Sequence, residues 1–485
     1  MCRDLNRGGA QPLYDGEVSL RRKELAVGSA LGVLAAAPML LALSGFMVDD
    51  ALVMARYAAN IARGAGYVWN RGEAPTDGVT PLGFCVLLAA FARGASPVLS
   101  AWLAAKWLGA FAWLVGAATV GIAILRIGGS RLRYAALLFL FASAPLGAWA
   151  VAGMETGVVL GLGAVAVGLR ALGRERGTLI CASVAAALRP ELVPWAVAVA
   201  LAPSNDGKLQ PMDRRLVRAL FVLGLPSGAS LVRYAAFGSF LPLSFRAKAP
   251  SLQLGMTYAG ACLLLTGVLA MVGWRRLPSW AKGLEIAVLV HFVAIAFAGG
   301  DWMPLSRLAV PVLPGAFLVA ACSLAVEPRA LAGLRVAVAL AGEVFTVWRV
   351  GASAAAVGAR RMRTLSELAP TLEGRTVATV DAGWVGVAAE RVVDLAGITD
   401  PNVAALPGGH TSKRIPNGFL AAREVDTLVL LIAPGKALEP ALVDTQFARW
   451  TEMHVVRQTG IAKEFRVVAQ STEPHYVVLH RVLAE

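Results

Sequence analysis

Apolar runs fill most of the first 350 residues of this chain, and several are long enough to cross a lipid bilayer. A helix needs about 20 apolar residues to cross the hydrocarbon core. Of the 485 residues, 57% are hydrophobic and only 16% are charged, too few charges to cover a soluble protein with so much apolar content. The sequence therefore predicts a mainly α-helical, polytopic membrane protein and excludes soluble and disordered classes.

The net charge of +14 comes from basic residues that cluster in short turns between the apolar runs. Cytoplasmic loops of membrane proteins carry such an excess of Lys and Arg, so this pattern predicts a cytoplasmic N-terminus and not a nucleic-acid partner. The basic turns cover residues 21–23, 126–133, 170–176, 208–218, 275–282 and 329–335.

About eleven membrane spans are expected, which would put the C-terminus outside the cytoplasm. Residues 80–93 are too short to span and are expected as a re-entrant or juxtamembrane helix on the outer face. The pair 178–188 and 191–203 is also short, and one kinked helix is the alternative to two spans. The expected spans are 25–47, 99–125, 134–151, 157–172, 178–188, 191–203, 217–232, 253–273, 283–299, 306–325 and 331–350.

The composition divides the chain into two predicted domains. Residues 1–355 form a membrane domain with a first extracytoplasmic loop at 48–98, and residues 356–485 read as a small extracytoplasmic α/β domain. Strand-like runs separated by turn residues occupy 376–380, 425–432 and 475–480. The five cysteines have no spacing typical of a disulfide framework or a metal site.

Two acids, Asp49 and Asp50, directly follow the first span and begin an amphipathic stretch at residues 50–65. Acids at a helix N-terminus commonly complement the helix dipole. A carboxylate pair at the membrane boundary can instead deprotonate an acceptor hydroxyl or stabilise positive charge on a sugar. The residue pattern alone leaves both readings open.

The loop that follows holds Tyr67, Trp69 and Asp77 among glycines and prolines. Aromatic faces are common in carbohydrate sites, and long loops with convergent polar groups are often functional. Interfacial anchoring of the aromatic rings is the alternative.

Ionisable residues inside or beside the membrane form the last set of candidates, because such groups are costly in hydrocarbon and often functional. Arg246 and Lys248 are placed to bind a phosphate on the outer side. Snorkelling or ion pairing is the alternative for each cation taken alone. The remaining members of the set are Lys106, Glu155, Arg189, Glu191, Asp301 and Arg307.

The order of motifs resembles the GT-C membrane glycosyltransferases, and within them the mycobacterial-type terminal β-(1→2)-arabinofuranosyltransferase family. The first-loop motifs are residues 49–51 (DDA), 56–58 (RYA), 66–73 (GYVWNRGE) and 78–82 (GVTPL). Later motifs are 153–157 (GMETG), 189–191 (RPE), 237–248 (FGSFLPLSFRAK), 299–304 (GGDWMP), 307–312 (RLAVPV) and 394–401 (DLAGITDP).

The resemblance implies a sugar donor carried on a polyprenyl phosphate, with arabinofuranose as the expected sugar. It also implies a polysaccharide acceptor of the cell envelope, such as arabinogalactan or lipoarabinomannan, held in part by the C-terminal domain. No nucleotide is required, in agreement with the lack of a Rossmann or Walker motif. A divalent metal is used in some GT-C branches and not in others, so the metal stays open.

The resemblance also assigns roles to residues. Asp50, or failing that Asp49, is expected to act on the acceptor hydroxyl or on the developing oxocarbenium ion. Substrate binding is expected from Arg56, Tyr67, Trp69, Asp77, Glu155, Glu191 and Asp301, of which Glu155 and Asp301 would hold sugar hydroxyls. The candidates for the lipid phosphate are Lys106, Arg189, Arg246, Lys248 and Arg307.

Two other classes of function share parts of this pattern. A transporter or flippase of lipid-linked sugar would also carry charges in the membrane, although the paired halves with broken helices typical of transporters are not seen. A membrane protein that binds glycan without catalysis is the second alternative.

Overall fold

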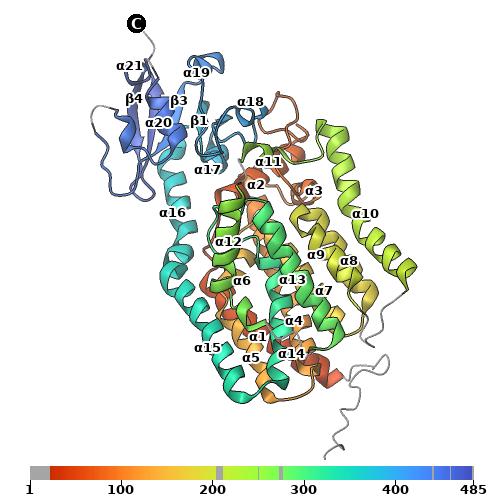
Figure 1. The fold of residues 1–485 in the computed structure, drawn as a ribbon. Coiled ribbons are helices and arrows are strands. Elements are labelled where there is room, and N and C mark those ends of the chain that lie inside the picture. Colours follow the sequence, from red (N-terminus) through yellow and green to blue (C-terminus); the bar gives the residue numbers. More distant parts are fainter. Residues whose placement is uncertain are drawn as a thin grey trace, which may run out of the picture.

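The computed structural model of this chain describes residues 22–203, 211–248, 251–271, 277–439, 442–458 and 460–482. A bundle of helices carries a small α/β domain at one end (Figure 1). The bundle contains α1 (Arg22–Ala42), α4 (Pro97–Arg126), α5 (Ala135–Ala142), α6 (Ala144–Ala150), α7 (Thr156–Ala171), α8 (Glu175–Leu188), α9 (Val193–Leu201), α10 (Met212–Phe237), α12 (Leu252–Leu265), α13 (Ser279–Phe297), α14 (Leu313–Val326) and α15 (Arg329–Thr346).

Among the described residues, five helices are long and apolar enough to cross a membrane. They are α1, α4, α10, α13 and the continuous helical run Arg329–Thr371, and the pair Arg131–Ala142 and Ala144–Ala150, bent by 51°, would make a sixth. Shorter apolar helices cover Thr156–Ala171, Pro190–Leu201, Leu252–Leu265 and Val310–Val326. The chain is thus a multi-pass membrane protein, and the count of eleven spans stays a prediction.

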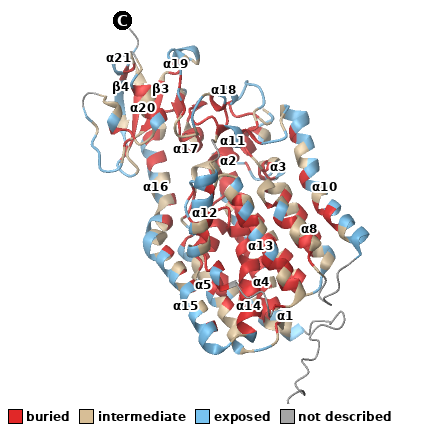
Figure 2. Ribbon diagram, in the orientation of Figure 1, coloured by how far each residue is buried: buried red, intermediate tan, exposed pale blue. Residues whose placement is uncertain are grey.

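Large apolar side chains on the outside of the bundle require lipid as their solvent. Trp107, Phe111, Phe297 and Trp348 are 75%, 68%, 72% and 73% exposed, respectively. The interior of the bundle is buried, while exposed residues follow the outer faces of α10 and α15 (Figure 2). Soluble proteins rarely expose apolar patches of this extent, so these faces are membrane-facing.

Small residues let the bundle helices approach closely, as is typical of membrane helices. Where α1 crosses α4, a Cβ atom on Gly32 would lie 1.9 Å from the carbonyl oxygen of Ala117. Any larger residue at this position would push the two helices apart.

The helices α8 and α9 are two separate helices. The guanidinium of Arg170, at the end of α7, donates to the carbonyl oxygen of Ala202 at 3.0 Å. Because Ala202 directly follows α9, that helix runs back toward the end of the bundle where α7 finishes and α8 begins. The break between α8 and α9 therefore lies at the opposite end, next to the start of α7.

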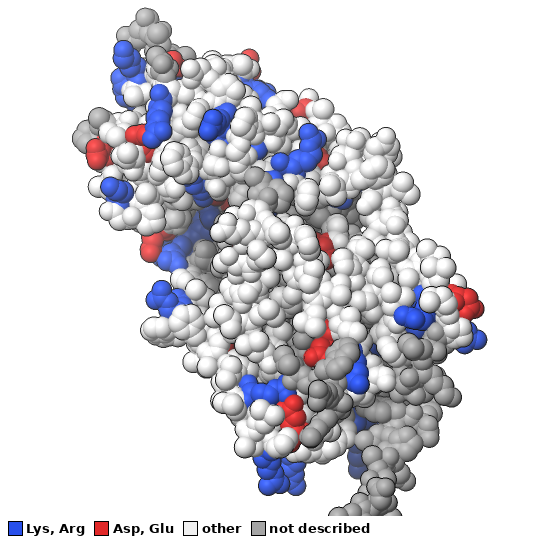
Figure 3. Space-filling view, in the orientation of Figure 1, with Lys and Arg blue, Asp and Glu red and all other residues white. Residues whose placement is uncertain are grey.

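Basic side chains gather at the end of the bundle far from the α/β domain, and the bundle face between the two ends is mostly uncharged (Figure 3). This is the arrangement that the predicted orientation requires, and the orientation of the termini stays a prediction. The N-terminus through Arg21 and parts of the basic turns 208–218 and 275–282 lie outside the described residues.

Two further helices lie between the bundle and the α/β domain. The helix α3 (Leu82–Ala89) has 8 residues and is about 12 Å long, so it does not span the membrane, as predicted. The helix α2 (Asp49–Ala62) was expected to be amphipathic, but every residue from Ala51 to Asn60 is buried. The α/β domain packs against α2 on one side and α4 packs on another, which buries the face expected to be polar.

The α/β domain contains a five-stranded sheet of order β2-β1-β3-β5-β4. The strands β1 (Thr376–Thr379), β2 (Arg391–Asp394) and β3 (Thr427–Leu431) are parallel, whereas β5 (Tyr476–Arg481) runs antiparallel to β3 and to β4 (Phe465–Gln470). The strands β1, β3 and β5 were predicted, and β2 and β4 were missed. The helices of this domain are α16 (Ala352–Leu368), α17 (Ala382–Ala388), α18 (Pro401–Ala404), α19 (Phe419–Ala422), α20 (Trp450–Val456) and α21 (Ile461–Glu464).

Candidate active site

Charged side chains from distant parts of the sequence interact electrostatically at the end of the bundle that faces the α/β domain. They come from the start of α2, the start of α7, the break between α8 and α9, the residue after α11 (Leu243–Ala247), and the loop 298–309. We call this set the charged cluster, and its members are Asp50, Glu155, Arg189, Glu191, Lys248, Asp301 and Arg307.

A buried ion pair anchors the charged cluster. The Nε of Arg307 lies 2.5 Å from Oδ2 of Asp301. The guanidinium also lies 5.9 Å from the ring centroid of Trp149, within the range of a cation–π contact. The other carboxylate oxygen of Asp301 is buried with no hydrogen bond among the described residues, so it is available to accept one.

The loop that carries this pair is tightly wound. Leu305 and Ser306 adopt positive φ angles of 58° and 53°, a conformation that costs non-glycine residues about 1–3 kcal/mol and is often found at functional sites. Gly300 also has a positive φ, and a Cβ atom there would lie 2.7 Å from Cβ of Tyr258. The hydroxyl of Tyr258 accepts a hydrogen bond from the backbone N–H of Leu308 at 3.1 Å, and these contacts hold the loop in place.

Arg189 joins two acids of the charged cluster. Its Nη2 and Nε lie 2.5 Å and 2.6 Å from Oε1 of Glu191, and its Nη1 lies 3.4 Å from Oε1 of Glu155. The same Nη1 donates to the hydroxyl of Thr156 at 2.8 Å. Since this guanidinium is largely occupied, Arg189 mainly positions the two acids. The second oxygen of Glu155 is buried without a hydrogen bond among the described residues.

Asp50 and Lys248 are the unpaired members of the charged cluster. Both side chains are half-buried, and among the described residues neither makes a hydrogen bond or an ion pair through its side chain. Burial raises the pKa of Asp50, while the charges of Lys248 and Arg307 oppose that rise. Burial and the charge of Arg307 lower the pKa of Lys248. A free carboxylate therefore lies within electrostatic reach of two cations.

Asp49 has a different environment although it is the next residue in the sequence. Its carboxylate accepts hydrogen bonds from the backbone N–H groups of Gly383 at 2.7 Å and Trp384 at 2.9 Å. Arg361 lies 3.8 Å away, and burial raises the pKa of Asp49 to about 6. Asp49 thus stabilises a helix N-terminus, as one reading of the sequence expected, but the helix is α17 of the other domain.

Arg56 and Trp69 join the first loop to the α/β domain. The indole N–H of Trp69 donates to the carbonyl oxygen of Val392 at 3.0 Å. The guanidinium of Arg56 lies 4.8 Å from the ring centroid of Trp69. It donates to the carbonyl oxygens of Trp69, Gly386, Ala389 and Glu390 and to the side chain of Asn70. These contacts engage the groups that were expected to contact the substrate.

The remaining candidates have partners elsewhere or none. Asp77 pairs with Arg233 at 2.9 Å. The ring of Tyr67 packs on Tyr57 with centroids 4.9 Å apart. Lys106 donates to the carbonyl oxygens of Ser44 at 2.8 Å and Phe46 at 3.0 Å. Arg246 is exposed, and its guanidinium makes no hydrogen bond or ion pair among the described residues. No hydrogen bond or ion pair among the described residues joins these four candidates to the charged cluster.

Two aromatic residues near the charged cluster were not singled out from the sequence. Trp302 and His410 have ring centroids 5.7 Å apart, so a loop of the α/β domain reaches the loop 298–309. Burial and the charge of Lys248 lower the pKa of His410 to about 4. Trp302 belongs to the GGDWMP motif, whereas His410 only follows a turn and belongs to no motif that would mark it as functional.

The sequence does not decide whether the protein uses a divalent metal. Across the residues that the structure describes, no three His, Cys, Asp or Glu side chains are grouped so as to hold a metal ion. The charged cluster instead interleaves its acids with Arg189, Lys248 and Arg307, a set of residues that does not fit a metal site.

Comparison with known proteins identifies the fold. No family model matches the sequence, and no curated protein matches it. The structure is similar to ArnT from Cupriavidus metallidurans, whose crystal structure was determined with bound undecaprenyl phosphate. The TM-score is 0.57 at 12% sequence identity, over 96% of this chain and 99% of ArnT. This similarity confirms the expected GT-C type of fold, and the arabinofuranosyltransferase branch stays a prediction.

Proposed function

We propose that this protein is a membrane glycosyltransferase that moves a sugar from a polyprenyl phosphate carrier to a glycan acceptor outside the cytoplasm. The observation that carries the proposal is the unpaired carboxylate of Asp50 within reach of the charges of Lys248 and Arg307. An anionic lipid carrier requires cations near the membrane surface, and a hydroxyl acceptor requires a base. The fold shared with ArnT, a protein that binds undecaprenyl phosphate, supports the same assignment.

In the proposed reaction, an acceptor hydroxyl attacks the anomeric carbon of the donor sugar and the bond from that carbon to the phosphate oxygen breaks. Asp50 takes the proton of the hydroxyl. The electron pair of the broken bond leaves with the polyprenyl phosphate, whose charge Lys248 and Arg307 stabilise. This single step inverts the anomeric carbon. The terminal β-arabinofuranosyl branch that the motifs resemble takes a β-linked donor to a β-linked product, which would need a second step. The product's stereochemistry, which the sequence leaves open, therefore distinguishes the two routes.

The sugar would be held by Glu155 and Asp301, two acids of the charged cluster that each pair with an arginine and keep a buried oxygen without a hydrogen bond among the described residues. Trp302 is 55% exposed and offers an aromatic face for carbohydrate. The approach of His410 to Trp302 would let the α/β domain contribute to the acceptor site. Arabinofuranose and a cell-envelope polysaccharide are the sugar and acceptor that the motif resemblance implies.

The function is tested with the purified full chain, a synthetic prenyl-phosphoryl arabinofuranose and an arabinan oligosaccharide. Formation of an extended oligosaccharide with release of prenyl phosphate is expected. Movement of the labelled lipid-linked sugar across liposomes without any extended oligosaccharide would support a flippase instead. Binding of the oligosaccharide without turnover of any prenyl-phosphoryl pentose donor would support a glycan-binding protein.

Transfer should depend on pH with a bell-shaped profile. Asp50 must be deprotonated to act as a base, and burial raises its pKa above the usual 3.8, so activity should rise with pH through that raised value. Lys248 must be protonated, and burial lowers its pKa below the usual 10.5, so activity should fall with pH through that lowered value. The two limbs are measured as kcat/KM against pH. In Lys248→Arg the alkaline limb should disappear, and its persistence there would exclude Lys248 as its cause.

A further inference from the structure

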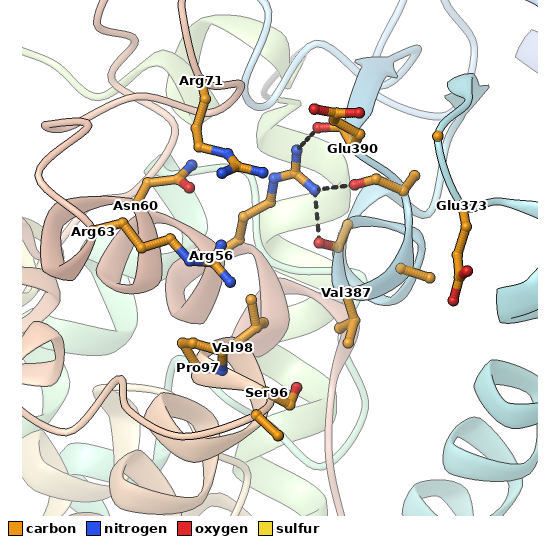
Figure 4. Close-up of a pocket in the computed structure, with 15 residues that line it drawn as sticks. Arg56, Asn60, Arg63, Arg71, Ser96, Pro97, Val98, Glu373, Val387 and Glu390 are labelled. Carbon is orange, nitrogen blue, oxygen red and sulfur yellow. Dashed lines mark hydrogen bonds between the residues drawn. The ribbon is translucent and has the colours of Figure 1, made fainter.

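A polar cavity of about 440 Å³ lies between the first loop and the α/β domain. None of the residues that line it belongs to the charged cluster. Figure 4 shows one wall formed by α2, Arg71 and the start of α4, and the opposite wall formed by α17 and residues 373 and 390. No step of the proposed transfer reaction involves this cavity.

Three arginines, Arg56, Arg63 and Arg71, line the first wall. The donors of Arg56 are taken up by hydrogen bonds to the protein. Arg63 and Arg71 are exposed, and their guanidinium groups have no hydrogen bond or ion pair among the described residues. Burial and then the charge of Arg71 lower the pKa of Arg56 to about 10, so these like charges lie close enough to repel one another.

The acids on the opposite wall do not neutralise these arginines. Glu373 and Glu390 are exposed, and in Figure 4 their carboxylates stand apart from Arg63 and Arg71. Neither acid forms an ion pair with a described arginine of the first wall. Two guanidinium groups with free donors therefore face the cavity, and such groups bind phosphate through paired hydrogen bonds.

The level of the cavity relative to the membrane identifies the source of the phosphate. Pro97 and Val98, the first residues of α4, line the cavity. The helix α4 has 30 residues and so is about 45 Å long, long enough to cross the hydrocarbon core and end near the headgroups. Ser96, just before α4, also lines the cavity and makes no capping bond through its hydroxyl. In a bilayer that α4 crosses, phospholipid phosphates would lie near its first residues.

We propose that this cavity binds the phosphate of a phospholipid headgroup in the leaflet next to the α/β domain, which is the outer leaflet in the predicted orientation, with Arg63 and Arg71 as the groups that contact it. A bound headgroup would bridge the first loop and the α/β domain and stabilise their contact. Free phosphate has the same chemistry as the headgroup phosphate, since each is a tetrahedral anion that two guanidinium groups can hold.

The test measures lipid binding, which is independent of sugar transfer. The purified full chain in maltoside detergent is titrated with dioleoyl phosphatidylglycerol, with dioleoylglycerol, which has the same tails but no phosphate, or with inorganic phosphate. Native mass spectrometry measures bound lipid, and the thermal unfolding midpoint measures stabilisation. The phospholipid should bind and raise the midpoint while dioleoylglycerol does not. Saturation by inorganic phosphate at the same concentration would assign the site to free phosphate.

The variant Arg63→Gln/Arg71→Gln should bind the phospholipid about tenfold more weakly or worse, because it loses two charge-assisted contacts. Arg414→Gln is the matched control, since Arg414 is an exposed arginine that does not line the cavity, and it should bind like the wild type. Because Arg63 and Arg71 are exposed and unpaired, the double variant should unfold at the wild-type midpoint without lipid. Three results would each overturn the proposal. The double variant could bind phospholipid as well as the wild type does, the wild type could bind dioleoylglycerol as well as phospholipid, or it could prefer an acidic oligosaccharide to phospholipid.

Discussion

Asp50→Asn should reduce sugar transfer by a factor of about 100 to 10,000, the usual contribution of a positioned general base. Asparagine has nearly the same shape as aspartate but cannot take the proton of the acceptor hydroxyl. Because the carboxylate of Asp50 makes no hydrogen bond or ion pair among the described residues, the substitution removes no stabilising contact. It also removes a half-buried charge whose pKa is raised by burial, so the variant should be at least as stable as the wild type. The rate of transfer and the thermal unfolding midpoint are measured on the same preparation.

Asp49→Asn provides the matched control at the adjacent position. The asparagine side chain keeps one acceptor oxygen but loses the second charge-assisted hydrogen bond that Asp49 makes with the N-terminus of α17. This should lower the free energy of unfolding by about 1–3 kcal/mol while most of the transfer rate per folded molecule remains. If Asp49→Asn abolishes transfer and Asp50→Asn does not, the assignment of the base to Asp50 is wrong.

The contrast between Asp49 and Asp50 also marks the limit of what the sequence could predict. Both acids were recognised as candidates from their place after the first span. They are separated by about 100° of rotation around one helix, and the sequence alone does not reveal which side meets which partner. The partner of Asp49 lies at Gly383 and Trp384, more than 330 residues later. Only the tertiary structure assigns one acid to a domain contact and leaves the other free.

The helices were predictable where the ends of an apolar run in the sequence coincide with the ends of the helix. The predicted span 331–350 shows where this fails, because the helical run continues from Arg329 to Thr371. Residues 352–368 are rich in Ala, Arg and Leu, which favour helix, so the loss of hydrophobicity marks where the membrane ends and not where the helix ends. In the α/β domain, the missed strand β2 reads RVVD, a single apolar pair between two charged residues, so it shows neither an apolar run nor an alternating pattern that would mark a strand.

The aromatic loop was predicted to be a functional segment, and its residues instead form a domain contact. Both uses need the same side chains: Trp69 offers an apolar face and an indole donor, and Arg56 offers several donors. A sugar can satisfy these groups, and so can the carbonyl oxygens of a neighbouring domain, as Val392 and Gly386 do here. Residue type therefore indicates that these side chains need hydrogen-bond and stacking partners, but which partner they meet depends on which segment lies against the loop.

Arg307→Gln should cause the largest combined loss of stability and activity. Arg307 is the ion-pair partner of Asp301, and both side chains are buried. Removing one member of a buried pair leaves an uncompensated charge and typically costs about 3–5 kcal/mol. The substitution also removes one of the two cations that are proposed to stabilise the departing phosphate. Chemical unfolding in detergent and the rate of transfer are both expected to show the loss.

A double substitution separates these two effects. In Asp301→Asn/Arg307→Gln no member of this buried pair is left as an uncompensated charge, so much of the lost stability should return, whereas transfer should stay low because the cation and the Asp301 carboxylate proposed to hold the sugar are both missing. Arg423→Gln is the control, since Arg423 pairs with Asp400 at 3.2 Å in the α/β domain; it should cost about 1 kcal/mol or less and leave transfer unchanged. Wild-type transfer by the double variant would mean that Arg307 serves only to neutralise Asp301, and the phosphate would then have to be stabilised by Lys248 alone.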